Sequence, residues 1–121
     1  MNRRNLLLLL SLLLVVGCTA PSGPAGLDVD LARQSFRRFL DTWKRGGTTA
    51  ELKAGSPPLI VGDPDWESGV KLLSYVIVEG KERNDGTNLH ITVRLTLGDK
   101  KAVSEVAYVV GTRPVVTIQR K

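Results

Sequence analysis

The chain has 121 residues, of which 42% are hydrophobic, and its seventeen Lys and Arg against twelve Asp and Glu give a formal charge of +5. This length leaves room for one domain with one core. Basic residues alternate with acidic ones along most of the chain and do not cluster with aromatic residues, so we expect no nucleic-acid partner.

The N-terminal segment has the three parts of a secretory signal. Arg3 and Arg4 precede an apolar stretch over residues 6–16, and the small residue Gly17 follows it. As a helix this stretch would span about 16 Å, roughly half of the ~30 Å hydrocarbon core, which disfavours a permanent transmembrane helix. We therefore expect residues 1–17 to be a cleaved signal peptide.

Cys18, the only cysteine, stands where the apolar stretch ends. The run Val15-Val16-Gly17-Cys18 resembles the lipobox of bacterial lipoprotein precursors, with Val where Leu is most frequent. The resemblance implies diacylglyceryl transfer to the Cys18 sulfur, cleavage between Gly17 and Cys18, and a membrane anchor of acyl chains such as palmitate. Thr19 in place of Asp implies the outer membrane in a two-membrane envelope. An ordinary secreted protein and a buried free cysteine are the alternatives.

A tether and a single domain follow the cysteine. Residues 18–27 contain "TAPSGPAG", whose prolines, glycines and small residues predict a flexible linker. Its eight residues reach at most about 28 Å, which keeps the domain beside the membrane. We assign residues 28–121 to one domain.

Apolar residues recur at spacings of four, three and four between positions 32 and 43, which predicts an amphipathic helix. Asp28 or Asp30 suits its start and Gly46-Gly47 its end. Aromatic residues at helical spacing usually belong to the core. The alternative is an apolar ligand pocket, and its lining residues would be Phe36, Phe39, Trp43 and Tyr75.

Two shorter helical segments follow. Thr48 and Glu51 form a capping box for a helix that ends at Gly55. In "GDPDWESG", residues 62–69, the N-cap Asp63 with Pro64 predicts a single helical turn. The alternate acids of this segment also suggest a calcium loop, but its spacing fits poorly and we assign no metal site. Trp66 is expected to plug the core edge, with recognition as the alternative.

Residues 70–121 are strand-like, and residues 89–97 alternate apolar with polar side chains. A turn at residues 98–101 then sets one register in which apolar residues meet and opposite charges pair. This register pairs Leu97 with Ala102, Val93 with Val106, Ile91 with Tyr108, Leu89 with Val110, and Arg94 with Glu105.

The register of the last hairpin stays open. A two-residue turn pairs Tyr108 with Thr117, and a loop one residue longer pairs it with Ile118. The first choice puts five apolar residues on the outer sheet face, a patch suited to a homodimer or another protein. These residues are Val103, Ala107, Val109, Val116 and Ile118. The second choice buries Val116 and Ile118.

These elements predict an α+β fold in which an N-terminal helix and a short helix pack on a curved antiparallel sheet of about four strands. The order, with "FLDTWKRGG" and "VAYVVGTRPVVTIQR", resembles the nuclear-transport-factor-2-like superfamily in its cystatin-like roll. The resemblance covers residues 28–121 and carries no family-specific motif.

The sequence points to no catalytic residue and no cofactor. His90, the only histidine, lies on the polar strand face, where a solvated side chain is favoured over a catalyst. The leading interpretation is a lipid-anchored envelope protein with a non-enzymatic domain that binds an envelope protein or a small apolar ligand. The alternative is a small-ligand carrier or an enzyme of the roll type, and a third is a structural homodimer.

Overall fold

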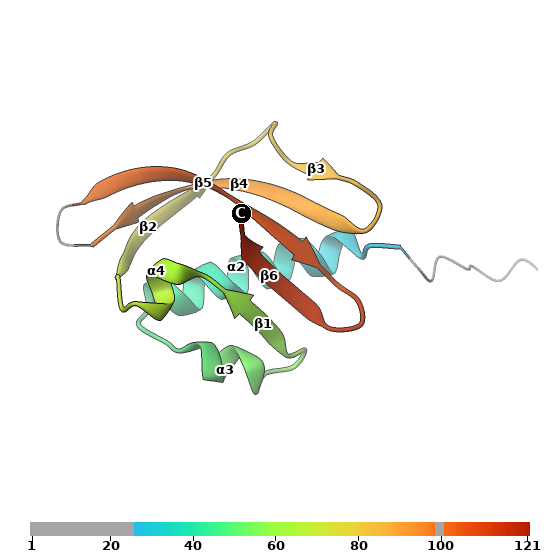
Figure 1. Ribbon diagram of the computed structural model, residues 1–121, viewed down its shortest axis with the longest axis horizontal. Helices are drawn as coiled ribbons and strands as arrows, with labels where there is room; N and C mark the ends of the chain where they lie inside the picture. The colour runs from blue at the N-terminus through green and yellow to red at the C-terminus, as the bar shows by residue number, and fades with distance from the viewer. Residues whose placement is uncertain (1–25, 99–100) are drawn as a thin grey trace, which may run out of the picture.

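The computed structural model describes residues 26–98 and 101–121. The predicted signal peptide, Cys18, most of the tether and the turn residues 99 and 100 lie outside this part. The described residues form three helices and six strands, whose arrangement is drawn in Figure 1. They are α2 (Val29–Lys44), α3 (Thr49–Lys53), β1 (Leu59–Gly62), α4 (Pro64–Glu67), β2 (Leu72–Ile77), β3 (Arg83–Asn84), β4 (Asn88–Leu97), β5 (Ala102–Gly111) and β6 (Val116–Arg120).

The three predicted helices form with the expected N-caps. Asp28 Oδ1 accepts a hydrogen bond of 3.0 Å from the Leu31 amide at the start of α2. Thr48 Oγ1 accepts one of 3.2 Å from the Glu51 amide at the start of α3. Asp63 caps α4, whose first residue is Pro64. Each cap satisfies amide groups that have no partner within the helix.

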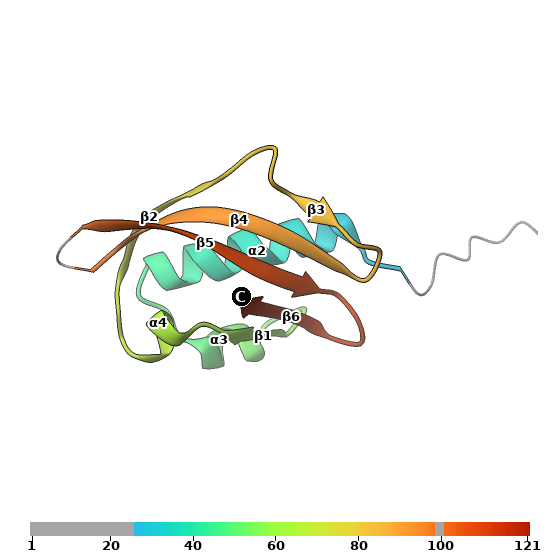
Figure 2. The ribbon, with the colours of Figure 1, turned by 45° about the horizontal axis from the view of Figure 1, so that its top comes forward.

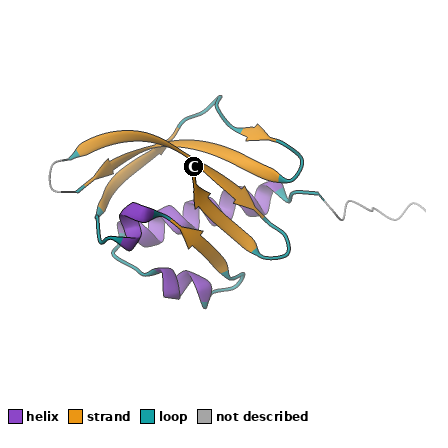
Figure 3. Cartoon of the chain, viewed as in Figure 1, coloured by secondary structure: helices purple, strands orange, loops and turns teal. Residues whose placement is uncertain are grey.

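The α+β class is confirmed, but the sheet is not a simple antiparallel one. The strand order is β1-β6-β5-β4-β2, and the short strand β3 pairs with β4 at residues 89–90 (Figure 3). β1 pairs with β6 in parallel, and all the other pairs are antiparallel. The expectation of about four antiparallel strands was wrong because β1 has only four residues, too few for an alternating pattern to show.

The β4–β5 hairpin has the predicted register at every position. Leu97 lies opposite Ala102, and the pairing continues to Leu89 opposite Val110. The predicted cross-strand ion pair also forms, with 3.3 Å between Arg94 Nε and Glu105 Oε1. Matching apolar and charged residues across two strands was sufficient to fix this register.

Both registers considered for the last hairpin were wrong. Tyr108 lies opposite Arg120, and Val110 lies opposite Ile118. Residues 112–115 form a longer connection than either alternative assumed. Val116 and Ile118 are nevertheless buried, as the second alternative required, because the shift is by two residues and keeps the same face inward. The five-residue apolar patch on the outer face therefore does not form.

The sheet curls around α2, which lies along its concave side in Figure 2. Apolar side chains from this helix and from five strands fill the space between the layers without a break. The core residues are Ala32, Phe36, Phe39, Leu40, Trp43, Leu52, Leu59, Leu72, Leu89, Ile91, Val93, Leu95, Tyr108, Val110, Val116 and Ile118. Within the described residues, no helix is both long and apolar enough to cross a membrane.

Candidate functional site

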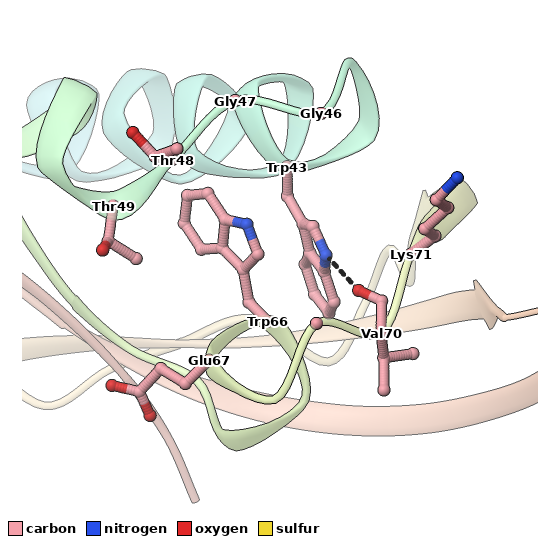
Figure 4. Close-up of a pocket in the computed structure, with 10 residues that line it drawn as sticks. Trp43, Gly46, Gly47, Thr48, Thr49, Trp66, Glu67, Val70 and Lys71 are labelled. Atoms are coloured by element: carbon pink, nitrogen blue, oxygen red, sulfur yellow. Dashed lines mark hydrogen bonds between the residues drawn. The ribbon is translucent and has the colours of Figure 1, made fainter.

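A groove of about 470 Å³ opens at the C-terminal end of α2 (Figure 4). We call it the tryptophan groove. Three separate segments form it: the end of α2 with the start of α3 and the loop between them, α4, and the residues between α4 and β2. Its lining residues are Trp43, Gly46, Gly47, Thr48, Thr49, Trp66, Glu67, Gly69, Val70 and Lys71. This volume is in the usual range for small-molecule sites, about 300–1,000 Å³.

Two indole rings form the apolar wall of the groove. The rings of Trp43 and Trp66 stack at an angle of 23° with 5.9 Å between centroids, and Phe39 contacts both from the core side. Trp43 is 3% exposed, and its Nε1 donates a hydrogen bond of 2.8 Å to the Val70 carbonyl. Trp66 is half-buried, and its indole nitrogen has no hydrogen-bond partner among the described residues. Trp43 is thus structural, whereas Trp66 keeps a free polar edge.

The position of Trp66 depends on the buried carboxylate of Asp63. Asp63 is fully buried, and its Oδ1 accepts hydrogen bonds of 2.9 and 3.2 Å from the amides of Asp65 and Trp66. α4 has only four residues and makes little helical hydrogen bonding of its own. The N-cap therefore holds the short helix that carries Trp66.

Side chains from β5 and β6 complete this support. The Tyr108 hydroxyl donates to Asp63 Oδ2, and Arg120 forms ion pairs with both Asp63 and Asp65. Burial, and then the neighbouring Asp63 carboxylate, raise the pKa of Tyr108 well above its usual range. Tyr108 consequently stays neutral and keeps donating. This network anchors α4 to the sheet with polar contacts that the hydrophobic core does not provide.

The rim of the groove is polar, with one charge of each sign. Glu67 and Lys71 lie well apart, on opposite sides of the two indoles, in Figure 4. Gly46 and Gly69 end α2 and α4 with φ of +84° and +86°, a conformation that favours glycine. A side chain added at either would meet nothing within 4 Å, so these glycines leave the groove open on both sides.

The four residues predicted to line one pocket do not share one. Phe36 and Phe39 are fully buried with 5.9 Å between ring centroids, and Trp43 belongs to the tryptophan groove. The Tyr75 hydroxyl donates to Asp41 Oδ1 at 2.7 Å. Burial, followed by this contact, raises the pKa of Tyr75. The aromatic residues of α2 thus fill the core, as their spacing favoured.

A second, smaller cavity of about 240 Å³ lies between α2 and the residues after β2. We call it the arginine cleft, and it is lined by Arg33, Phe36, Arg37, Ile77, Val78, Glu79, Gly80, Glu82 and Ile91. Arg33 binds Glu82 through two hydrogen bonds, of 3.0 and 2.5 Å. The Arg33 guanidinium lowers the pKa of Glu82, so this pair stays charged at the rim.

His90 lies on the outer face of β4, as predicted, but it is half-buried there. Its Nε2 lies 2.7 Å from Asp85 Oδ2, and its Nδ1 is buried without a partner in the described structure. Backbone amides, first that of Asn88, together with His90 hold the pKa of Asp85 well below its usual range. The histidine therefore helps to close the turn between β3 and β4.

The contacts at "GDPDWESG" are those of the helix-cap interpretation. Asp63 accepts hydrogen bonds from two backbone amides, and Asp63 and Asp65 both pair with Arg120. Over residues 26–98 and 101–121, no group of three or more His, Cys, Asp or Glu side chains is placed to hold a metal ion. Trp66 packs at the core edge, as expected.

The groove itself was missed from the sequence. Its residues come from positions 43–49 and 66–71, and no spacing rule connects these two segments. The glycines that follow each tryptophan, Gly46-Gly47 and Gly69, were the only local signal. Comparisons with protein-family models, with curated proteins and with solved structures find no match.

Proposed function

We propose that this chain is a lipid-anchored protein of the bacterial cell envelope whose domain binds a ligand in the tryptophan groove without converting it. The anchor rests on the lipobox-like run that ends at Cys18. The binding site rests on one observation: Trp66, whose indole N–H has no hydrogen-bond partner among the described residues, lines a groove of ligand size.

The fold supports an anchor that leaves the groove open. The domain begins at the N-terminal end of α2, where the Leu27 amide binds the Gly86 carbonyl at 3.3 Å. The tryptophan groove is at the other end of this 16-residue helix, about 24 Å away at 1.5 Å per residue. A tether would therefore attach at the end of α2 opposite the groove.

The lining favours an uncharged ring with hydroxyl groups, such as a sugar. The indole of Trp66 offers an apolar surface and one N–H donor, which suits a ligand with a flat apolar face and a polar edge. The Glu67 carboxylate accepts hydrogen bonds and the Lys71 ammonium donates them, and the hydroxyl groups of a ligand can do both. Because the two charges balance, the rim selects neither anions nor cations.

Indole N–H signals in nuclear magnetic resonance test this binding, with chitotriose and maltotriose as probes. We expect the Trp66 signal to shift on titration and the Trp43 signal, bonded to Val70, to move much less. Trp66→Leu should abolish binding without unfolding, and Lys53→Gln, away from the groove lining, is the matched control. Failure of both sugars to shift the Trp66 signal would contradict this ligand class.

The anchor is tested by moving the thiol. Cys18→Ser should leave an uncleaved precursor without acyl chains. Adding Ser22→Cys to that variant restores a thiol four residues further on, outside the lipobox, and should not restore acylation. Metabolic labelling with a palmitate analogue reads out both variants. Label on Cys18→Ser, or on the shifted thiol, would contradict an anchor at Cys18.

A carrier of the nuclear-transport-factor-2-like type is the second candidate. The observation that favours it is the arginine cleft, where Phe36 and Ile91 form an apolar floor beside two arginines. This lining suits a short apolar carboxylate such as octanoate. The carrier account predicts that octanoate raises the melting temperature and that Arg37→Gln removes the rise. An unchanged melting temperature counts against this candidate.

A further inference from the structure

The two edges of the sheet differ in how they are protected. β1 has four residues, follows Pro57 and Pro58, and packs against α3. Short length, proline and a covering helix are the usual means by which proteins prevent an edge strand from pairing with another chain. β2, at the other edge, has six residues and no proline.

The sequence of β2 is suited to strand pairing. "LLSYVI" contains no charged residue and no proline, and most of its residues favour strands. Leu73 and Val76 are 41% and 61% exposed, among the largest exposed fractions of large apolar side chains in the described structure. The bulge between Leu72 and Ser74 disturbs only the start of the strand, and Ser74–Ile77 pair regularly with β4.

The open edge presents a defined set of main-chain groups. The Val78 amide donates to the Thr92 carbonyl of β4 at 2.9 Å. Successive residues of a strand alternate in direction, so Val76 also faces β4, and the amides and carbonyls of Tyr75 and Ile77 face outward. Among residues 26–98 and 101–121, no strand pairs with this outer side.

We propose that β2 pairs antiparallel with β2 of a second copy of the chain, with Val76 opposite its own counterpart. In this register Tyr75 of each copy lies opposite Ile77 of the other, so both outward-facing residues exchange hydrogen bonds. The two Val76 side chains meet at a non-hydrogen-bonded position, where facing side chains approach most closely. A second copy fits because such a two-fold interface is self-complementary.

Site-specific disulfides test this register in the full chain, expressed in a bacterium and extracted in detergent. Facing α-carbons at this kind of position lie about 4.5 Å apart, within the range for a disulfide. Val76→Cys should form covalent dimers on mild oxidation, at least about fivefold more than Gln119→Cys, whose residue is also exposed but has a paired strand on each side. No dimer from Val76→Cys, or equal amounts from both, would overturn the proposal.

Two further measurements keep the result interpretable. The unsubstituted chain shows whether Cys18 itself cross-links, and such a band would contradict acylation rather than the β2 interface. Val76→Lys places a charge on the edge and should reduce the dimer in native mass spectrometry at least about tenfold, whereas Gln119→Lys, between two paired strands, should not. Circular dichroism confirms that both lysine variants fold. An undiminished dimer in folded Val76→Lys would also overturn the pairing.

Discussion

At its N-terminal end α2 is held mainly by hydrogen bonds to two loops, whereas its C-terminal end is set in a cluster of aromatic rings. The Asp28 amide donates to Thr112 Oγ1 at 3.1 Å, and the Leu27 amide binds the Gly86 carbonyl. At the other end Trp43 stacks with Phe39 and Trp66. The first arrangement fixes the start of the helix, and the second leaves a groove beside the rings.

The largest effect is expected where the aromatic cluster loses a buried ring. Trp43→Ala should lower the free energy of unfolding by about 3–5 kcal/mol, because it leaves a cavity and an unpaired Val70 carbonyl. Trp66→Ala should cost less, about 1–2 kcal/mol, because Trp66 is only half-buried. Urea unfolding measures both values. Equal losses would contradict the division into a structural and a ligand-binding tryptophan.

Removal of the buried Asp63 carboxylate should have the next largest effect on stability. Asp63→Ala removes the cap of α4 and leaves Arg120 and Tyr108 without their buried partner. It should therefore lower the free energy of unfolding by about 3 kcal/mol. Tyr108→Phe keeps the cap and should cost about 1 kcal/mol. Urea unfolding and Trp66 fluorescence check the pair. An unchanged Trp66 environment in Asp63→Ala would show that the acid does not position this ring.

A smaller effect is expected at the N-terminal end of α2. Thr112→Val removes the acceptor for the Asp28 amide and should lower stability by about 1 kcal/mol. The matched control is Thr92→Val on the outer face of β4, which should change stability little. Hydrogen exchange at Asp28 should quicken only in Thr112→Val. Equal exchange in both variants would mean that Thr112 does not hold this end.

The smallest effect is the pH dependence of stability at Asp85, in the turn whose Gly86 carbonyl accepts a hydrogen bond from the Leu27 amide. The pKa of Asp85 is lower in the folded chain than in the unfolded one, so its contribution is present above the ordinary pKa of about 4 and is lost as the pH falls below it. The stability difference between the unsubstituted chain and Asp85→Asn should shrink as the pH falls below about pH 4. A difference that grows as the pH falls below about pH 4 would contradict this sign.

Local patterns predicted the parts of the fold that local contacts determine. The helix spacing identified the aromatic face of α2, and the caps at Asp28, Thr48 and Asp63 were all visible as short motifs. The β4–β5 register followed from counting outward from one turn. In each case the deciding residues lie within about twenty positions of one another.

Contacts between distant segments were not predictable in this way. The parallel pairing of β1 with β6 joins Leu59 to Val116, and no local pattern signals it. Asp63 was recognised as a cap, but its bonds to Tyr108 and Arg120 depend on the fold. The tryptophan groove likewise depends on α4 being brought beside the end of α2. The missed features are those that join residues far apart in the chain.

The central claim is that the domain is fixed to a membrane through Cys18 at the end opposite its groove. Intact-mass spectrometry of the protein extracted from bacterial membranes tests this claim most directly. We predict a polypeptide that begins at Cys18 and carries the added mass of a diacylglyceryl group, with a further acyl chain on the new amino group. A polypeptide that begins at any other residue, or that carries Cys18 as an unmodified thiol, would contradict the account.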